Sequence, residues 1–326
     1  MKPLIQITRR GLKFSGSKKD IHGLRGEFNR RHCLKFRNFL ETELMREIAQ
    51  GIQTARFHTM VHKGIGVEAC MGVNKAYLLL LFLTNDAKFF DLMQEITECG
   101  EIGCFNARVY RMVPGKGHYD SWHDDAQKKD RRFIAMSINL SEQIYKGGLL
   151  QIRQKGAGTA GEKIANTGFG DAIIFRIHPR FEHRVTTLKG NQPKTALAGW
   201  FQEIPDFNLL LKKKGRGRLS LRRGSHQPMR ILEGSVYPAK DAVFIHRGMH
   251  TDLMNLKNGY YYRLNAVGGR IWDLMRQRRS LRSVVQTLSE EYDADSKQIE
   301  KDTLRLMRHL HNNGLVESGT NGDSPL

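Results

Sequence analysis

The sequence predicts an α+β protein: an antiparallel barrel or jelly-roll domain with flanking helices, followed by a small winged-helix-like α/β domain. Short apolar runs broken by Gly and Pro fill residues 106–202, which is typical of antiparallel β architectures. Helical periodicity precedes this region and returns near the carboxyl end. Residues 206–236 hold basic residues, Gly and Ser with little apolar periodicity, as a domain linker does.

Length and charge set the limits on size and partners. The chain has 326 residues, of which 40% are hydrophobic, so we expect one large domain with a smaller one appended. The formal net charge of +20 predicts attraction to polyanions, which could be nucleic acid, an anionic membrane surface or an acidic peptide. Charge alone does not choose among these partners.

The first elements are a basic segment and two helices. Residues 1–31 are basic and contain Gly, so we expect them to be only partly ordered. A helix is predicted where apolar residues recur every four positions, at Leu40, Leu44, Ile48 and Ile52. A second helix is predicted over 85–100, where Asn85 or Asp86 can cap it and Gly100 can end it.

No segment predicts a membrane partner or secretion. The start of the chain lacks the apolar core of a signal peptide, and the apolar run at 78–83 is too short to cross a bilayer. The four cysteines match neither a redox pair nor a zinc knuckle, so reduced thiols are expected. A cytoplasmic protein is therefore predicted.

The strands and the second domain complete the organisation. The predicted domains are 32–205 and 237–319, with a tail at 320–326. The first domain has six strand-like runs: ARVYRMV, RRFIAMSINL, GGLLQIR, DAIIFRI, HRVTTL and TALAGWF. The second has three strand-like segments, DAVFIHR, DLMNLK and GYYYRLN, and then three helices. The second of these helices begins near Ser280 and the third near Asp295.

A candidate metal site lies in the first domain. His123 and Asp125 are two residues apart, so on a strand their side chains leave the same face, and His183 follows about sixty residues later. Two histidines and one carboxylate form the facial set of non-haem Fe(II) oxygenases. His118 with Asp120, and His178, are competing ligands. Each competing residue precedes the corresponding ligand by five positions. Because five is an odd number, the two sets would face opposite sides of an unbroken strand.

The order of motifs resembles the prolyl-hydroxylase-like branch of the 2-oxoglutarate and Fe(II) dependent oxygenases over residues 32–202. The resemblance rests on Tyr110, Pro114-Gly115, Trp122, His123-Asp124-Asp125, Asn139, Gly147-Gly148, Leu150, 168–175, His183-Arg184-Val185 and Gly199-Trp200-Phe201. It implies a double-stranded β-helix of the jelly-roll or cupin-like kind. It also implies Fe(II) held by His123, Asp125 and His183, with 2-oxoglutarate as cosubstrate and O2 as oxidant, and hydroxylation as the reaction.

The same resemblance assigns cosubstrate residues. The family places a basic residue about ten positions after the second histidine, where it pairs with the distal carboxylate of 2-oxoglutarate. Lys194 occupies that place, although a surface lysine is the alternative and Arg184 a possible substitute. Tyr110 matches a position whose hydroxyl often reaches the cosubstrate, and a buried core tyrosine is the alternative reading.

The second domain resembles the PqqD-like peptide chaperones, which bind the leader segments of ribosomally made precursor peptides. In that family the leader adds as a strand beside the third strand, here about 259–264, and packs on the third helix, here about 297–312. The resemblance therefore implies peptide binding by Tyr261 and Arg263, expected on the exposed side of the strand, and by Lys301 and Arg305 on the helix.

The sequence supports a cytoplasmic oxygenase that hydroxylates a residue of such a precursor peptide. The rival is an oxygenase acting on nucleic acid or a nucleic-acid-associated protein, because the second domain also reads as a winged helix and carries a basic stripe. That stripe comprises Lys297, Lys301, Arg305 and Arg308. A peptide is favoured over nucleic acid because this domain is only mildly basic. A non-catalytic adaptor is disfavoured because all three ligands are present.

Overall fold

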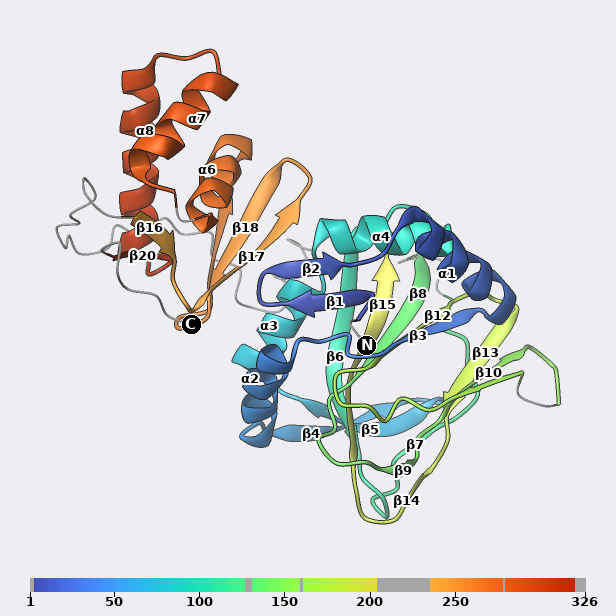
Figure 1. Ribbon diagram of the computed structural model, residues 1–326. Coiled ribbons are helices and arrows are strands. Elements are labelled where there is room, and N and C mark those ends of the chain that lie inside the picture. The colour runs from blue at the N-terminus through green and yellow to red at the C-terminus, as the bar shows by residue number, and fades with distance from the viewer. Residues whose placement is uncertain (1–2, 127–130, 159–160, 204–234, 278, 320–326) are drawn as a thin grey trace. The chain divides into compact units, whose positions relative to one another are not determined.

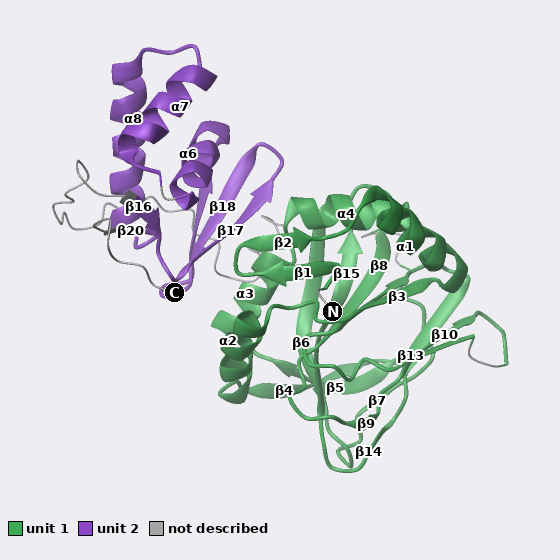
Figure 2. Cartoon of the chain, viewed as in Figure 1, with its two compact units in different colours: residues 1–215 green, residues 216–326 purple. Residues whose placement is uncertain are grey.

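The computed structural model describes residues 3–126, 131–158, 161–203, 235–277 and 279–319. The chain divides into two compact units, residues 1–215 and 216–326, shown in green and purple in Figure 2. The division falls within the predicted linker 206–236, which lies outside the described residues up to 234. The predicted tail 320–326 also lies outside them.

Unit 1 is built on a large antiparallel sheet (Figure 1). Its strands run in the order β3-β12-β8-β15-β6-β5-β4, and the short strand β7 pairs with β5. The bounds are β3 Cys33–Phe36, β4 Phe57–His62, β5 Gly66–Met71, β6 Cys104–Met112, β7 Tyr119–Asp120, β8 Arg132–Asn139, β12 Ala172–Arg176 and β15 Lys194–Gln202.

A smaller sheet provides the second layer. It has the order β11-β10-β13, and a further short pair joins β9 to β14. These strands are β9 Lys146–Gly147, β10 Leu150–Gln154, β11 Glu162–Ile164, β13 Phe181–Val185 and β14 Leu188–Lys189. Two curled antiparallel layers of this kind make a jelly roll, which confirms the predicted fold class.

Helices cover the outer face of the large sheet. The aromatic rings of Phe89 and Phe90 pack on Phe201 at 5.6 and 6.0 Å, and the Tyr77 hydroxyl donates to the Ala107 carbonyl. Successive residues of a strand face opposite sides, so Trp200, next to Phe201, faces inward. The helices are α1 Lys18–Arg31, α2 Thr42–Gln53, α3 Lys75–Leu83 and α4 Ala87–Thr97.

Two helix predictions are confirmed, and a further helix lies between them. Helix α2 buries Leu44, Ile48 and Ile52 as expected, although Leu40 precedes the helix. Helix α4 is capped by the Asp86 side chain. Helix α3, which coincides with the apolar run at 78–83, was not predicted. All of its residues from Ala76 to Leu83 are buried, so the run lacks the polar face that marks a helix in sequence.

The amino-terminal segment differs from the expectation of partial order. Residues 5–31 form the hairpin of β1 Ile5–Thr8 and β2 Gly11–Phe14 and then α1. Ile7 and Phe28 are fully buried, and a capping box of Ser17 with Asp20 begins the helix. The basic composition misled the prediction, because charged residues on the exposed face do not prevent burial of a few apolar ones.

Unit 2 contains the expected three-stranded sheet and three helices. These are β17 Ala242–Arg247, β18 His250–Asn255, β19 Tyr260–Leu264, α6 Ala266–Arg276, α7 Leu281–Glu291 and α8 Ser296–Asn312. Ser280 and Asp295 cap α7 and α8 at the predicted positions. An unpredicted pair, β16 Ser235–Pro238 with β20 Val316–Gly319, joins the two ends of the unit. Trp272 lies at the centre of its core.

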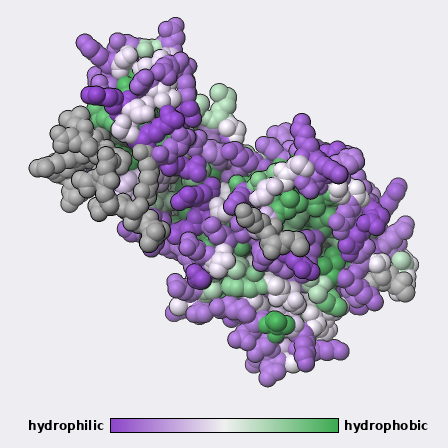
Figure 3. All heavy atoms as spheres, in the orientation of Figure 1, coloured by the Kyte–Doolittle hydropathy of each residue, from purple (hydrophilic) through white to green (hydrophobic). Residues whose placement is uncertain are grey.

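Surface and membrane properties follow from these elements. Hydrophilic side chains cover most of the face of each unit that Figure 3 displays. Among the described residues, none of the helices has the length and apolar character needed to cross a membrane.

Candidate metal centre

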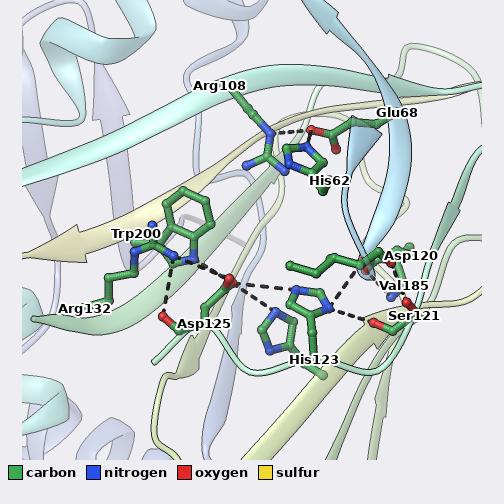
Figure 4. Close-up of polar contacts among 12 residues, drawn as sticks. His62, Glu68, Arg108, Asp120, Ser121, His123, Asp125, Arg132, Val185 and Trp200 are labelled. Carbon is green, nitrogen blue, oxygen red and sulfur yellow. Dashed lines mark hydrogen bonds and ion pairs between the residues drawn. The ribbon is translucent and has the colours of Figure 1, made fainter. Parts of the chain in front are cut away.

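The three predicted ligands meet between the two layers of unit 1. His183 lies on β13, and His123 forms an isolated antiparallel bridge with it, in which each main-chain N–H donates to the other residue's carbonyl. This pairing sets the two imidazole rings 4.3 Å apart, and Asp125 follows two residues later (Figure 4). Ligand atoms of His123, Asp125 and His183 all lie within 4.8 Å of one another.

The orientation of His123 suits a metal ligand. Its Nδ1 lies 2.7 Å from the Ser121 carbonyl oxygen, which can only accept, so Nδ1 carries the proton. Nε2 therefore carries the free electron pair and can coordinate a metal ion. The Nε2 atoms of His123 and His183 lie 3.9 and 3.3 Å from Asp125 Oδ2, so the three atoms can share one ion.

Asp125 is held as an anion. Burial by itself raises its pKa, but contacts with His183, the Trp200 indole and the nearby His123 hold the pKa well below its usual range. The Trp200 Nε1–H donates to Oδ2 at 2.7 Å, and an Arg132 Nη atom lies 3.5 Å from Oδ1. A carboxylate that stays ionised is what a divalent cation requires.

The competing histidines have other partners. His118 Nδ1 accepts the Val113 N–H, and His178 Nδ1 accepts the Arg180 N–H, so neither belongs to the ligand group. Asp120, however, does not face away. It lines the same cavity and accepts the Val185 N–H at 2.7 Å, because β7 is only two residues long and the chain bends after it.

A cavity of about 260 Å³ lies beside the ligands, and Lys194 is among the residues that line it. Lys194 is buried, and its ammonium donates to the Gly148 carbonyl at 3.2 Å and lies 5.9 Å from the Tyr110 ring centroid. No ion pair within 4.0 Å involves this ammonium among the residues that the structure describes. Burial lowers the pKa of Lys194 to about 8, partly offset by Asp120 and Glu68.

Arg184, the possible substitute for Lys194, lies elsewhere. Its Nε donates to Gln151, and its guanidinium stacks on the Trp122 ring. The Arg153 guanidinium stacks on the same ring. These residues are on the outer face of the β10–β13 pair, whereas His183 and Ile152 face inward. Of the two basic candidates, only Lys194 faces the cavity.

A second polar group in the cavity was missed by the sequence analysis. Glu68, on β5, accepts from Arg108 Nε on β6, and its Oε1 lies 3.0 Å from His62 Nε2 on β4 (Figure 4). All three side chains line the cavity. No motif spacing marks them, because strand pairing rather than sequence distance brings them together.

In unit 2 the four residues expected to bind peptide differ in exposure. Lys301 and Arg305 are exposed on α8, as expected. Tyr261 and Arg263 were expected on the exposed side of the strand, and this was wrong for Tyr261, which is only 8% exposed. Arg263 makes a bidentate pair with the buried Asp252 at 2.7 and 2.9 Å. Pairing with β18 places both on the face of the sheet opposite Tyr262, which packs in the core.

Family models match both units. Residues 106–202 match the model of the 2OG-Fe(II) oxygenase superfamily, and residues 252–316 match the model of PqqD, the coenzyme PQQ synthesis protein D. No curated protein sequence matches the chain.

Solved structures resemble each part. A Pseudomonas putida prolyl-4-hydroxylase is 18% identical, with 56% of this chain and 99% of that chain covered and a TM-score of 0.44. A Trichoplax adhaerens prolyl hydroxylase in complex with a hypoxia inducible factor peptide is 16% identical over 58% and 94% of the two chains, with a TM-score of 0.42. TbiB1 in complex with the TbiA(beta) leader peptide is 28% identical over 27% and 99%, with a TM-score of 0.24.

The site fits the metal and cosubstrate that the superfamily implies. Two imidazoles and one carboxylate on one side of a cavity leave other coordination positions open, as Fe(II) oxygenases require. Lys194 places a buried ammonium group in the lining of the same cavity. Together, Fe(II), 2-oxoglutarate and dioxygen supply the oxidising chemistry, and the protein supplies orientation and exclusion of water. Residues 106–202 therefore lie in an oxygenase domain of the Fe(II)- and 2-oxoglutarate-dependent kind, and the same chain carries a PqqD-like domain.

Proposed function

We propose that this enzyme hydroxylates a residue of a ribosomally made precursor peptide whose leader is bound by the PqqD-like domain. The observation that carries the proposal is the presence of both family matches in one chain. An oxygenase needs its substrate near the iron, and a peptide-recognition domain in the same chain can hold a peptide substrate there. In this proposal residues 32–205 hold the catalytic domain and residues 237–319 the recognition domain.

The residues at the metal centre and around Lys194 have proposed roles. His123, Asp125 and His183 bind Fe(II), and Trp200 and Ser121 fix the orientation of two of these ligands by hydrogen bonds. Lys194 pairs with the distal carboxylate of 2-oxoglutarate, which gives the buried ammonium the anion it lacks among the described residues. Tyr110 lies beside Lys194, is itself buried, and contributes to the wall around the cosubstrate.

The leader is proposed to bind along β19. This strand is an edge of its sheet and has a described partner only on the β18 side, so its outer backbone groups can pair with an added strand. Tyr261 and Arg263 would contribute main-chain hydrogen bonds rather than side-chain contacts, because the Tyr261 side chain is buried and the Arg263 side chain is paired with Asp252. Lys301 and Arg305, exposed on α8, would attract acidic leader residues.

The test uses the full-length protein with Fe(II), 2-oxoglutarate and precursor peptides encoded beside its gene. A mass gain of one oxygen on the core of a precursor, lost when the leader is deleted, is the expected result. The double substitution Lys301→Glu with Arg305→Glu should weaken leader binding, whereas Arg282→Glu on α7 is the matched exposed control. Modification that proceeds equally well without the leader would contradict the proposal.

Salt dependence separates the rival substrate class. Binding of nucleic acid releases counterions and falls steeply with salt, whereas strand addition through backbone hydrogen bonds falls much less. Titration of the protein with leader peptides and with duplex and single-stranded DNA at two salt concentrations should favour the leader. Tight, salt-sensitive DNA binding with no response to any leader would favour the nucleic-acid substrate instead.

A further inference from the structure

Arg108 is enclosed by other side chains, yet part of its own side chain is accessible from the cavity. Its Nε donates to Glu68, and its guanidinium lies 5.5 Å from the Trp200 ring and 5.8 Å from the Tyr110 ring. Although these groups enclose it, 31% of its side chain remains accessible, and it lines the cavity. Neither of its Nη nitrogens has a hydrogen-bond partner among the residues that the structure describes. Figure 4 shows the guanidinium directed toward the side where His123 and Asp125 lie.

The neighbours of Arg108 fix this orientation. Glu68 is nearly buried, and its Oε1 also lies within 3.0 Å of His62 Nε2 and 3.4 Å of the Cys70 thiol, so the carboxylate is anchored from three elements. A planar guanidinium held at Nε keeps its two Nη groups in one direction. The group is therefore preorganised to donate two parallel hydrogen bonds into the cavity.

Arg108 and Lys194 serve different ligands. Both lie on the inner face of the large sheet, but Lys194 pairs across from Met112 at the end of β6, and Arg108 pairs with Ala198, four residues along β15. Lys194 has no carboxylate partner among the residues that the structure describes, so in this proposal it takes the cosubstrate. Arg108 is already paired with Glu68. Its partner on β15, Ala198, is two residues before Trp200, which donates a hydrogen bond to the metal ligand Asp125.

We propose that Arg108 is a specificity-determining residue that binds the acyl oxygen, of a carboxylate or a carboxamide, on the side chain presented for oxidation. This rests on the proposed peptide function and narrows it to acidic residues and their amides. A carboxylate accepts two parallel hydrogen bonds from a guanidinium, and a carboxamide accepts hydrogen bonds from it through its one carbonyl oxygen. An aliphatic or proline side chain would leave both Nη groups desolvated and unpaired, and a cationic side chain would be repelled.

The test measures binding by the intact protein under anaerobic conditions, with Fe(II) and 2-oxoglutarate present, so that no turnover occurs. The probes are leaderless N-acetyl Gly-X-Gly amides, with Asp, Asn, Glu, Gln, Leu, Pro or Lys at the central position, and ligand-observed NMR gives the affinities. The acyl peptides should bind about ten- to hundredfold more tightly than the Leu, Pro and Lys peptides. Arg108→Met should remove this preference, and Arg108→Lys should keep only part of it, because an ammonium cannot donate two parallel bonds.

Arg111→Met is the matched control, since Arg111 lies on the same strand but on its outer face, where it donates to Thr195 and stacks on Phe57. Iron binding and the thermal unfolding midpoint of each variant report on its fold. A preference for carboxylate over carboxamide, or the reverse, identifies the source of the acyl oxygen, and either supports the proposal. Three outcomes overturn it: Leu or Pro peptides that bind as tightly, an acyl preference that survives Arg108→Met, or no binding of any acyl peptide. The probes lack a leader, so failure of leader recognition alone leaves this result unchanged.

Discussion

At the scale of single residues, hydrogen bonds orient two of the three proposed ligands of the metal centre. The Ser121 carbonyl fixes the tautomer of His123, and the Trp200 indole fixes one oxygen of Asp125. A metal ligand held in this way loses little conformational freedom on binding, which favours affinity. The positions of the ligands therefore lead to a direct prediction.

Replacing His123, Asp125 or His183 with Ala should abolish Fe(II) binding and succinate formation from 2-oxoglutarate. Each substitution removes one of the three proposed protein ligands. His118→Ala is the matched control, because His118 accepts a backbone N–H outside the ligand group. Metal analysis of the purified variants checks the prediction. If His118→Ala or His178→Ala abolished Fe(II) binding while His123→Ala kept it, the ligand set would be wrong.

The pKa of Lys194 predicts a pH dependence of cosubstrate binding. Burial lowers this pKa to about 8, so the ammonium is charged below that pH and loses its proton above it. A dianion binds best to the charged form, so the apparent Kd for 2-oxoglutarate should rise as pH increases beyond about 8, by about tenfold per unit at most. Lys194→Arg stays charged and should flatten this profile, and Lys194→Ala should raise the Kd at every pH. Titrations between pH 6.5 and about 9.5 give the profile. The same rise in Lys194→Arg would assign it to another group.

At the scale of elements, close contact between helices α2 and α3 supports the layer behind the sheet. A Cβ built on Gly51 of α2 would lie 2.4 Å from the Ala76 Cβ of α3, so only Gly fits at this crossing. A Cβ on Gly23 of α1 meets nothing within 4 Å. The two glycines therefore offer a matched comparison within helices of one domain.

Gly51→Ala should lower the free energy of unfolding by about 1–3 kcal/mol, because the added methyl overpacks the α2–α3 contact. Gly23→Ala should raise it by about 0.4–1 kcal/mol, because Ala restricts the unfolded chain and favours the helix. Urea denaturation of the two variants measures both changes. Equal effects of the two substitutions would mean that α3 moves away at little cost.

At the scale of the whole molecule, the two units divide recognition and chemistry between them in the proposed function. Joining the units in one chain raises the concentration of a bound core peptide near the iron, so affinity can reside far from the reacting atoms. The arrangement predicts how the protein responds when the chain is cut.

A protein ending at residue 230 should keep its iron and its slow, peptide-independent consumption of 2-oxoglutarate, but lose most modification of full-length precursor. Residues 231–326 supplied as a separate chain should restore only part of that activity, because the covalent connection no longer raises the local concentration. Mass spectrometry of the precursor gives the extent of modification. Full activity of the truncated protein would contradict the division of labour.

Local patterns in the sequence were sufficient for much of the fold. The six strand-like runs became β6, β8, β10, β12, β13 and β15, and Asp86, Ser280 and Asp295 cap helices where expected. Capping residues and period-two alternation act over a few residues, so a single segment contains the information. The H-x-D spacing is local in the same sense, and the order of motifs then selected His183.

Tertiary structure alone decided the rest. Strand pairing brought Arg108 and Glu68 together from different strands, and a bend after a two-residue strand turned Asp120 into the cavity. The burial of Tyr261 depends on which face of a strand is covered, and the order of residues 5–31 depends on the core that receives Ile7 and Phe28. Sequence determined which residues can hold a metal and where most elements begin, because these properties depend on nearby residues. The shape and charge of the cavity beside the metal depend on contacts between residues far apart in the chain, and only folding creates those contacts.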